Sequence, residues 1–490
     1  MSKNLRCRAV KIIAYGCTAS IRGCPCFPAP PAPEPCCKGL NLVQNPSFEA
    51  GLTGWTANNA ALTNVPFEGT QEALLGPNVA SIFQDFPLDR RCRDPLFLSF
   101  NVFAPSSNNG GSLIAEVSWL DSKRRAIASG LRLFIPENRI NTTSRITYFA
   151  VTGRPPAGTA GARLQFSKGS GTATDLIKLD QVILAPIRTP NLVQNSGFEL
   201  GLARWTATAF IPDFSVPYAG SAQLHATDNG TLFQDIPLKN LPAQSPLLIS
   251  FAASGGQTSL SVQLLWLNRA GDPIGTPGIS LFIPGETFVA QGNNYLTYLA
   301  LTEPAPAGAA AARILLVDTI DKQTDIFVDQ VIVAGARSAN LVRNGSFENG
   351  LSDWTAVNVS AVLSESAYEG SAVARVGTEG GLLFQEVPLP SAAGHSFLFN
   401  FGFRSSSIGV DLPGTTIAEV RWLDGMGREI GLGLSLVVPN TSLRSQWLVY
   451  TGITAPAPPG VAAARVQFTR STGSPEVVVE LDKVVLGRLV

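Results

Sequence analysis

The sequence has little charge. Its 36 basic and 36 acidic side chains cancel to a formal net charge of zero, and charged residues make up 15% of the chain, against a usual value of about 25%. Without an excess of one sign, no electrostatic surface for nucleic acid or for an anionic membrane is expected. A chain with so little self-repulsion is instead expected to pack against copies of itself.

Residues and motifs typical of catalysis are scarce as well. The chain has two histidines, His225 and His395, and they occupy different places in the repeats described below. It contains no Walker loop, no dinucleotide-binding glycine motif between a strand and a helix, and no H-E-x-x-H zinc motif. The sequence therefore predicts a protein that is not an enzyme and has no organic cofactor.

No apolar run approaches the roughly 20 residues that a transmembrane helix needs. The first residues, MSKNLRCRAVKIIAYGCTAS, place basic residues before a short apolar stretch. Lys11 interrupts this stretch and no clean A-x-A cleavage pattern follows, which disfavours a secretory signal. A lipoprotein site at Cys17 is a minor alternative, because Ala14 stands where such a site has Leu.

What the sequence does contain is a threefold repeat. Asn41 begins NLVQNPSFEAGLTGWT, Asn191 begins NLVQNSGFELGLARWT and Asn340 begins NLVRNGSFENGLSDWT, at spacings of 150 and 149 residues. Later landmarks keep the same step: IFQDFPL, LFQDIPL and LFQEVPL, then EVSWLD, QLLWLN and EVRWLD, and finally LDQVILA, VDQVIVA and LDKVVLG. We predict a Cys/Pro-rich arm over 1–40 and modules over 41–188, 189–337 and 338–490.

Each module reads as all-β. Short runs rich in Val, Ile, Leu, Phe and Thr alternate with Gly, Pro, Asn and Ser clusters, and no helical period is sustained. In the first module, strands are expected over 80–86, 96–104, 113–120, 128–135, 147–153, 162–167 and 177–185. Seven or more such strands predict a jelly-roll β-sandwich in each of three tandem domains, behind an extended or disordered arm.

The junctions between modules are short. ILAPIRTPNLV and IVAGARSANLV leave about five residues between the last strand of one module and the start of the next, far fewer than a flexible tether has. We expect the three modules to form a fairly stiff rod.

The opening NLVxNxxFExGLxxW, together with a closing strand of the form D-x-V-x-L, resembles carbohydrate-binding modules of families 4, 9 and 22, which are galactose-binding-like jelly rolls. It is similar also to a related Firmicute module that precedes tandem repeats in proteins of spore surfaces. The resemblance covers residues 41–490 three times over.

The resemblance implies a structural calcium in each module, held by the Glu of the opening motif and an Asp of the last strand. The candidate pairs are Glu49 with Asp180, Glu199 with Asp329, and Glu348 with Asp482. Calcium binds several oxygen ligands, which these carboxylates and nearby carbonyls can supply. The alternative is that each Glu accepts backbone N–H bonds and holds no metal. Lys483 places a positive charge beside the third pair.

Glycan binding by a sandwich usually depends on exposed aromatic rings. Trp119, Trp266 and Trp422 alternate with polar Glu116, Gln263 and Glu419, so the tryptophans are expected in the core and the polar residues on the opposite face. Trp55, Trp205 and Trp354, just after a turn, are also expected in the core. The remaining candidates for stacking on a sugar are Tyr148, Tyr298, Tyr450 and Trp447.

Six of the seven cysteines lie in the arm, at Cys7, Cys17, Cys24, Cys26, Cys36 and Cys37, and the seventh is Cys92 in the first module. Their spacing differs from the paired C-x-x-C of zinc sites, which leaves zinc as the weaker alternative. An odd total suggests intermolecular pairing. We expect the arm to reach a neighbouring copy and to be fixed there by disulfides, with Cys92 as an acceptor.

Two functions are compatible with these features. The first is a structural subunit of a bacterial spore or cell surface that assembles with copies of itself into a layer or fibre. The second is a tandem carbohydrate-binding adhesin that recognises a surface glycan, in which three weak sites gain avidity. A non-catalytic part of a polysaccharide hydrolase is a weaker third interpretation.

Overall fold

The computed structural model describes residues 39–89, 91–105, 111–137, 139–140, 143–169, 175–292, 294–319, 325–377, 380–405, 414–471 and 477–490, without the side chains of 227 and 228. Residues 1–38 of the predicted arm, with its six cysteines, lie outside these ranges. The three modules belong to one compact unit. Among the described residues, no helix has the length and apolar character that crossing a membrane requires.

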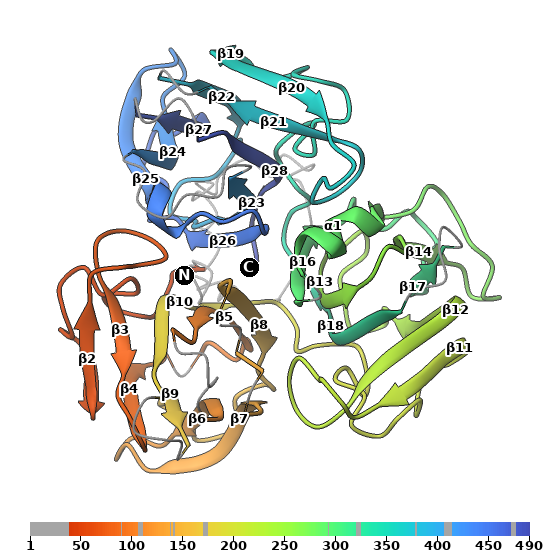
Figure 1. The fold of residues 1–490 in the computed structure, drawn as a ribbon, viewed down its shortest axis with the longest axis horizontal. Helices are drawn as coiled ribbons and strands as arrows, with labels where there is room; N and C mark the ends of the chain where they lie inside the picture. The colour runs from red at the N-terminus through yellow and green to blue at the C-terminus, as the bar shows by residue number, and fades with distance from the viewer. Residues whose placement is uncertain are drawn as a thin grey trace, which may run out of the picture. The chain divides into compact units, whose positions relative to one another are not determined.

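Module 1 contains ten strands. They are β1 (Thr56–Asn58), β2 (Ala60–Thr63), β3 (Glu72–Leu75), β4 (Ala80–Pro87), β5 (Leu96–Phe103), β6 (Leu113–Leu120), β7 (Ala126–Ile135), β8 (Ile146–Val151), β9 (Gly161–Lys168) and β10 (Ile177–Pro186). They form two five-stranded antiparallel sheets in the orders β1-β4-β9-β6-β7 and β2-β3-β10-β5-β8. The two sheets face each other as a jelly-roll sandwich (Figure 1).

Module 3 repeats this arrangement. Its strands are β19 (Thr355–Val357), β20 (Val359–Leu363), β21 (Ala372–Val376), β22 (Leu382–Pro388), β23 (Leu398–Ser405), β24 (Thr415–Leu423), β25 (Glu429–Pro439), β26 (Leu448–Ile453), β27 (Ala463–Arg470) and β28 (Val479–Gly487), with a 3-10 turn η1 (Asn440–Ser442). The sheet orders are β19-β22-β27-β24-β25 and β20-β21-β28-β23-β26.

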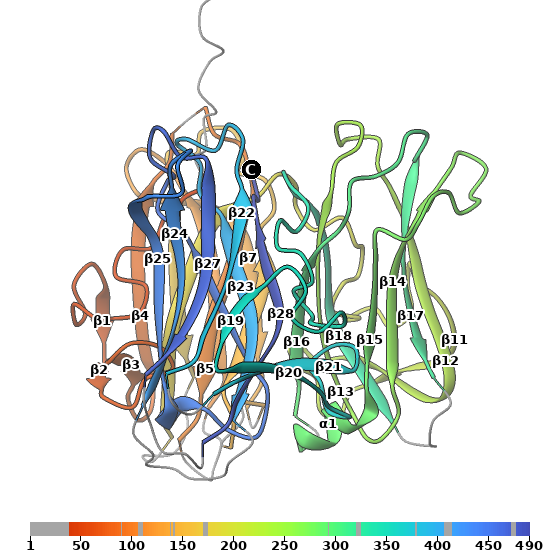
Figure 2. The ribbon, with the colours of Figure 1, turned by 90° about the horizontal axis from the view of Figure 1, so that it is seen from above.

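Module 2 joins its two sheets through long strands. It contains β11 (Thr206–Asp213), β12 (Gln223–Pro237), β13 (Leu247–Gly255), β14 (Leu260–Leu267), β15 (Ile279–Ile283), β16 (Leu296–Leu301), β17 (Ala311–Asp318), β18 (Ile326–Gly335) and the short helix α1 (Gly285–Ala290). The first part of β12 pairs with β18 and the second part pairs with β17. Figure 2 shows β12, β17 and β14 running beside one another.

The two sheets of a module differ in burial. In β4 and β9 every second residue is buried, which is the pattern of a strand with one face in the core and one toward solvent. All ten residues of β10 are buried, as are those of β13, β16 and β26. We call the first kind the outer sheet and the second kind the inner sheet. The inner sheet is covered on both faces except at its edge strands β2 and β20, which are partly exposed.

All seven strands predicted for module 1 are present, with ends shifted by at most a few residues. The strands that the sequence did not predict are β1, β2 and β3. They have three or four residues each, and β1 and β2 bury almost nothing, so no periodic apolar signal marks them.

The opening motif forms a turn that side chains hold together. The Asn45 side-chain amide donates to the carbonyl oxygens of Gly51 and Thr53, and its oxygen accepts the Ala50 N–H. The Trp55 ring nitrogen donates to the Asn45 carbonyl oxygen at 3.2 Å. Asn195 and Asn344 make the same bonds in the other modules. The repeated motif is therefore a signature of this fold.

The modules contact one another in a closed cycle. Inner-sheet strands β8, β16 and β26, one from each module, contact each other, and β10 of module 1 contacts β26 of module 3. The Thr147 hydroxyl donates to the Val449 carbonyl oxygen at 2.6 Å, across the contact between modules 1 and 3. The expected rod is therefore wrong, because a rod would join only modules that follow each other in sequence.

Candidate functional site

The carboxylates predicted to bind calcium in module 1 hold one loop, residues 67–71. Oε1 of Glu49 accepts the backbone N–H groups of Thr70 and Gln71, and Oε2 accepts the Thr70 hydroxyl. Oδ2 of Asp180 accepts the N–H groups of Phe67 and Glu68 at 2.9 and 3.0 Å. We call this segment the docking loop, together with its counterparts 218–222 and 368–372.

The same bracing recurs in the other two modules. Glu199 accepts bonds from the backbone and hydroxyl of Ser221, and Asp329 accepts the N–H of Ala219 at 3.1 Å. In module 3, Glu348 and Asp482 brace their loop in the same way. Each predicted Glu and Asp pair therefore acts on a single loop.

The Asp of each pair also stabilises a bulge in the last strand. Asp180 is fully buried, and its Oδ1 accepts the N–H of the next residue, Gln181, at 2.7 Å. Gln181 has a positive φ of 50°, and the register of β10 against β5 shifts at this point. Burial raises the pKa of Asp180 well above its ordinary value, because desolvation disfavours the charged form.

This geometry matches the hydrogen-bond alternative for the carboxylates, since their oxygens already have N–H donors. Across the described ranges, no cluster of three or more His, Cys, Asp or Glu side chains has the geometry of a metal site. In module 3 the Lys483 ammonium lies 3.2 Å from the Glu369 carboxylate, which places a cation of the chain itself beside the third pair. Calcium at the three pairs stays a prediction.

The predicted sugar-stacking aromatics lie at the contacts between modules. Tyr148, Tyr298, Tyr450 and Trp447 are at most 1% exposed. Tyr148 stacks on Tyr218 of the module 2 docking loop, with ring centroids 4.3 Å apart. The expectation of surface exposure for all four is wrong, because the inner sheet that carries them faces neighbouring modules.

The three contacts between modules are equivalent. Tyr298 stacks on Tyr368 of module 3 at 4.6 Å, and Tyr450 stacks on Phe67 of module 1 at 4.1 Å. Each docking loop thus places an aromatic ring on the preceding module, and the loop of module 1 completes the cycle on module 3. Backbone bonds from Gly69, Gly220 and Gly370 to Val437, Phe134 and Phe282 of the preceding module repeat at each contact.

The outer sheets leave a polar and aromatic surface in every module. In module 1, the Arg163 guanidinium lies over the Phe83 ring, 4.3 Å from its centroid, and binds Asp85 at 2.7 Å. Gln165 pairs with Phe83 across β4 and β9 and with Glu116 across β9 and β6. These five side chains form what we call the outer ladder.

The outer ladder recurs with substitutions at three of its five positions. In module 3 its members are Phe384, Glu386, Arg465, Gln467 and Glu419. In module 2 they are Phe233, Asp235, Arg313, Leu315 and Gln263. Leu315 replaces the Gln of the other two ladders, so the module 2 surface is less polar at its centre.

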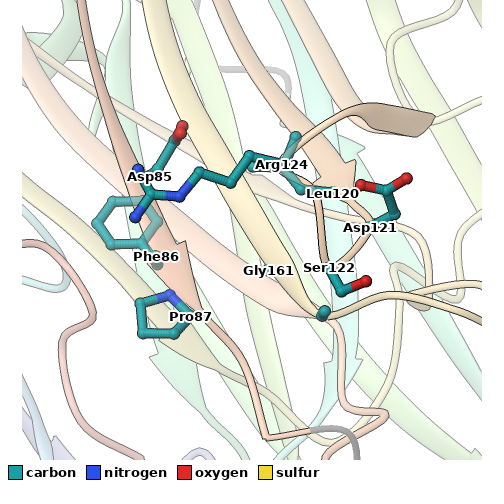
Figure 3. A pocket seen from close by; sticks show the side chains of 9 residues that line it. Asp85, Phe86, Pro87, Leu120, Asp121, Ser122, Arg124 and Gly161 are labelled. Carbon is teal, nitrogen blue, oxygen red and sulfur yellow. The ribbon is translucent and has the colours of Figure 1, made fainter.

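A pocket of about 300 Å³ lies at the end of the outer sheet of module 1. Asp85, Asp121, Ser122 and Arg124 contribute polar groups to its lining, and the Arg124 side chain extends across it toward Asp85 and Phe86 (Figure 3). Arg124 has a φ of 60°, a left-handed conformation. The equivalent hairpin positions in modules 2 and 3 are Gly271 and Gly427. Module 1 therefore has an arginine where glycine has no steric strain.

The other predictions from sequence have mixed outcomes. Trp119, Trp266, Trp422, Trp55, Trp205 and Trp354 are at most 8% exposed, which confirms them as core residues. Cys92 lies partly exposed between β4 and β5, and its role in a disulfide stays a prediction. His225 binds Asp325 at 2.8 Å, whereas His395 contacts Arg488 in module 3.

The outer ladder was not predicted, although the sequence contains a signal for it. Phe83 and Asp85 alternate with apolar or core-facing residues in IFQDF, as Arg163 and Gln165 do in ARLQF. Alternation places both pairs on one face of the sheet, and recurrence in the other modules marks the positions. The Arg and its acid belong to strands separated by almost 80 residues, so only the strand order brings them together.

No protein-family model and no curated protein matches this chain. Among solved structures, the tandem of two family 22 carbohydrate-binding modules from Paenibacillus barcinonensis Xyn10C is similar at 14% identity and a TM-score of 0.26, covering 61% of this chain and 98% of that one. The module TmCBM61, solved with β-1,4-galactotriose, is similar at 23% identity and a TM-score of 0.23, covering 31% of this chain and 99% of that one.

A third similar structure is the C-terminal family 22 carbohydrate-binding module of Clostridium thermocellum Xyn10B. It has 15% identity and a TM-score of 0.24, and the match covers 29% of this chain and 94% of that module. The solved structures that match include families 4 and 22, which the opening motif resembles. The strand order and pairing of this chain itself define three jelly-roll β-sandwiches.

Proposed function

We propose that the chain is a non-catalytic carbohydrate-binding protein whose modules bind glycan on their outer sheets. The observation that carries this proposal is the outer ladder, which places an aromatic ring, a guanidinium and a carboxylate at matching positions on the outer sheet of every module and adds an amide in modules 1 and 3. A binding site for a polar ligand combines apolar surface with a few fixed hydrogen-bonding groups. Sugar hydroxyls need both donors and acceptors, and the ladder supplies both.

The ladder is held in place before any ligand arrives. The Arg163 guanidinium binds both oxygens of Asp85, at 2.7 and 3.0 Å, while it stacks on Phe83. The Gln165 amide nitrogen donates to the Ser167 hydroxyl, and the Ser118 hydroxyl donates to Glu116. Side chains with fixed rotamers lose little entropy on binding, which favours recognition of a weakly held ligand.

The pocket beside Arg124 gives module 1 a further place for a sugar ring. Its lining combines the donors of Arg124 with the acceptors of Asp85 and Asp121. Because Leu315 makes the module 2 ladder less polar, modules 1 and 3 are expected to bind more tightly than module 2.

The test is binding of the full chain to a polysaccharide panel that includes xylan and β-1,4-galactan, followed by titration with the matching oligosaccharide. The double variant Glu116→Ala with Gln165→Ala removes two hydrogen-bonding groups and should weaken binding at module 1 about tenfold. Each hydrogen bond to the ligand contributes roughly 0.5–1.5 kcal/mol to the binding free energy. Leu363→Ser, which changes an exposed residue of β20 outside the ladders, is the control and should change little. Equal binding by all three proteins would contradict the ladder as the site.

The second candidate is the structural subunit of a spore or cell surface, assembled with copies of itself. The observation that favours it is the position of Cys92 in a partly exposed segment of module 1. Under this proposal, Cys7, Cys17, Cys24, Cys26, Cys36 and Cys37 of the arm form disulfides with a neighbouring copy. Reductant should then dissociate the native assemblies, and assemblies of unchanged size would exclude it.

A further inference from the structure

The main strand-to-strand contacts between modules use the inner face of each sandwich, and each docking loop also bonds the edge strand of the preceding module's outer sheet, β7, β15 or β25. The strand pairs with the most extensive contacts across module boundaries are β8 with β16, β8 with β18, β8 with β26, β10 with β26, β16 with β26 and β16 with β28. Every one of these strands belongs to an inner sheet. In each module the outer ladder lies on the other sheet, so it faces away from the centre where the three inner sheets meet.

The modules have little freedom to reorient. The inner-sheet strands that meet at the module contacts, such as β10, β16 and β26, are buried on both faces, and an aromatic stack fixes each of the three contacts. The linkers are packed as well: the Thr189 hydroxyl accepts the Gly335 N–H, and the Arg337 N–H donates to the Arg488 carbonyl oxygen. A cycle closed on all three sides leaves no hinge that could turn two ladders toward one another.

We infer that the three glycan sites point in different directions. One protein molecule would therefore bridge separate polysaccharide chains instead of binding one polysaccharide chain at several sites. This inference rests on the proposed function. Avidity along one strand requires that the strand reach two sites at once, and it is lost where geometry forbids this. A polysaccharide chain bound on one outer sheet would have to wrap around a two-layer sandwich, with sheets about 10 Å apart, to reach the outer sheet of the next module. Separate strands meet no such obstacle.

The test uses the full chain, in reductant and shown by light scattering to be monomeric, so that disulfide-linked dimers cannot cause bridging. Beads coated with xylan or with β-1,4-galactan are mixed with increasing protein, and turbidity reports their aggregation. If the protein bridges beads, aggregation should first rise with protein concentration. It should then fall when protein exceeds the available polysaccharide chains, because each protein molecule then binds only one bead. The affinity for soluble polysaccharide should exceed that for the oligosaccharide by less than tenfold.

The decisive variant removes two accessible polar groups of the module 3 ladder through Glu386→Ala with Gln467→Ala. Oligosaccharide binding at module 1 should persist, while bead aggregation falls at least fivefold. The control Leu363→Ser changes an exposed residue of β20, outside the ladder, and should aggregate beads like the wild type.

The possible failures are distinguishable. Oligosaccharide binding without aggregation by the wild type, or affinity for soluble polymer more than a hundredfold above that for the oligosaccharide, would overturn the divergent arrangement and leave the proposed function standing. Absence of oligosaccharide binding to the wild type would overturn both.

Discussion

Phe67 and Tyr450 stack with their ring centroids 4.1 Å apart and their planes 2° from parallel, although 383 residues separate them in the chain. This contact joins module 1 to module 3 and closes the cycle. The equivalent contacts join modules that a short linker already holds together, whereas this one has no covalent support. It is therefore the place where opening of the cycle can be tested.

Tyr450→Ala should open the contact between modules 1 and 3. Loss of a buried aromatic ring costs about 3–5 kcal/mol, and the opening should be detected as faster hydrogen exchange in β8 and β26. Tyr148→Ala removes the equivalent ring between modules 1 and 2 and is the matched comparison, with faster exchange expected in β8 and in the loop 218–222. If hydrogen exchange in Tyr450→Ala becomes faster only in β26 and not in β8, the contact does not stabilise the position of module 1.

The contact between modules 1 and 3 should weaken as pH rises. Glu68 is 5% exposed there; it accepts the Val437 N–H at 2.8 Å and a bond from Ser47, and it faces the negative charges of Glu49 and Asp180. Burial raises the pKa of Glu68 above 4.5. A raised pKa in the folded state contributes stability that is full below pH 4.5 and is lost as pH rises through the folded value.

This pH dependence can be tested with a pairing that module 3 already uses. Glu369, the counterpart of Glu68, is bound to Lys483, whereas the residue in the Lys483 position of module 1 is Gln181. Gln181→Lys should reduce the loss of stability between pH 4.5 and 8 in urea unfolding. Glu68→Gln, which cannot ionise, should reduce it as well. An unchanged pH profile in Glu68→Gln would show that another group is responsible.

Asp329→Ala should destabilise module 2 by leaving buried N–H groups without an acceptor. The N–H groups of Ala219 and Gln330 both donate to this carboxylate. An unsatisfied buried donor costs about 1–3 kcal/mol. Urea unfolding measures the cost, and hydrogen exchange in the loop 218–222 locates it. Asp235→Ala, which removes an exposed carboxylate from the same module, should cost about 1 kcal/mol or less.

Calcium provides a separate test of the same carboxylates. Because Glu49 and Asp180 already accept N–H and O–H donors, we expect the melting temperature to be the same in EDTA and in millimolar calcium. A metal that binds only the folded state would raise it as its concentration rises. A rise that is abolished by Glu49→Gln would establish the calcium site that the resemblance implies.

Arg124→Gly should separate stability from binding. The left-handed backbone conformation strains a non-glycine residue by about 1 kcal/mol, so the variant should be more stable by about that amount. It also removes the side chain that crosses the module 1 pocket, and oligosaccharide binding at module 1 should weaken. A variant that gains stability and binds as before would show that the pocket takes no part in recognition.

The sequence by itself determined the threefold repeat and seven of the strands of module 1, but not the short strands β1, β2 and β3. Alternation of apolar and polar residues in β4, β6 and β9 specifies one buried and one exposed face, and Gly, Pro and Asn clusters end the strands, so local pattern was enough. The core tryptophans followed from the same alternation. The apolar run VILA at the end of β10, residues 182–185, carried a further signal, because a strand buried on both faces loses its alternation.

Only the tertiary structure decided what covers that second face. Tyr148, Tyr298 and Tyr450 have the composition of either sugar-binding or interface residues, and it is the closed cycle that buries them. The outer ladder likewise depends on strand order, since β4 and β9 lie far apart in the chain and become neighbours only in the jelly roll. Local preferences set the strands, whereas contacts between distant segments set which faces remain open to a ligand.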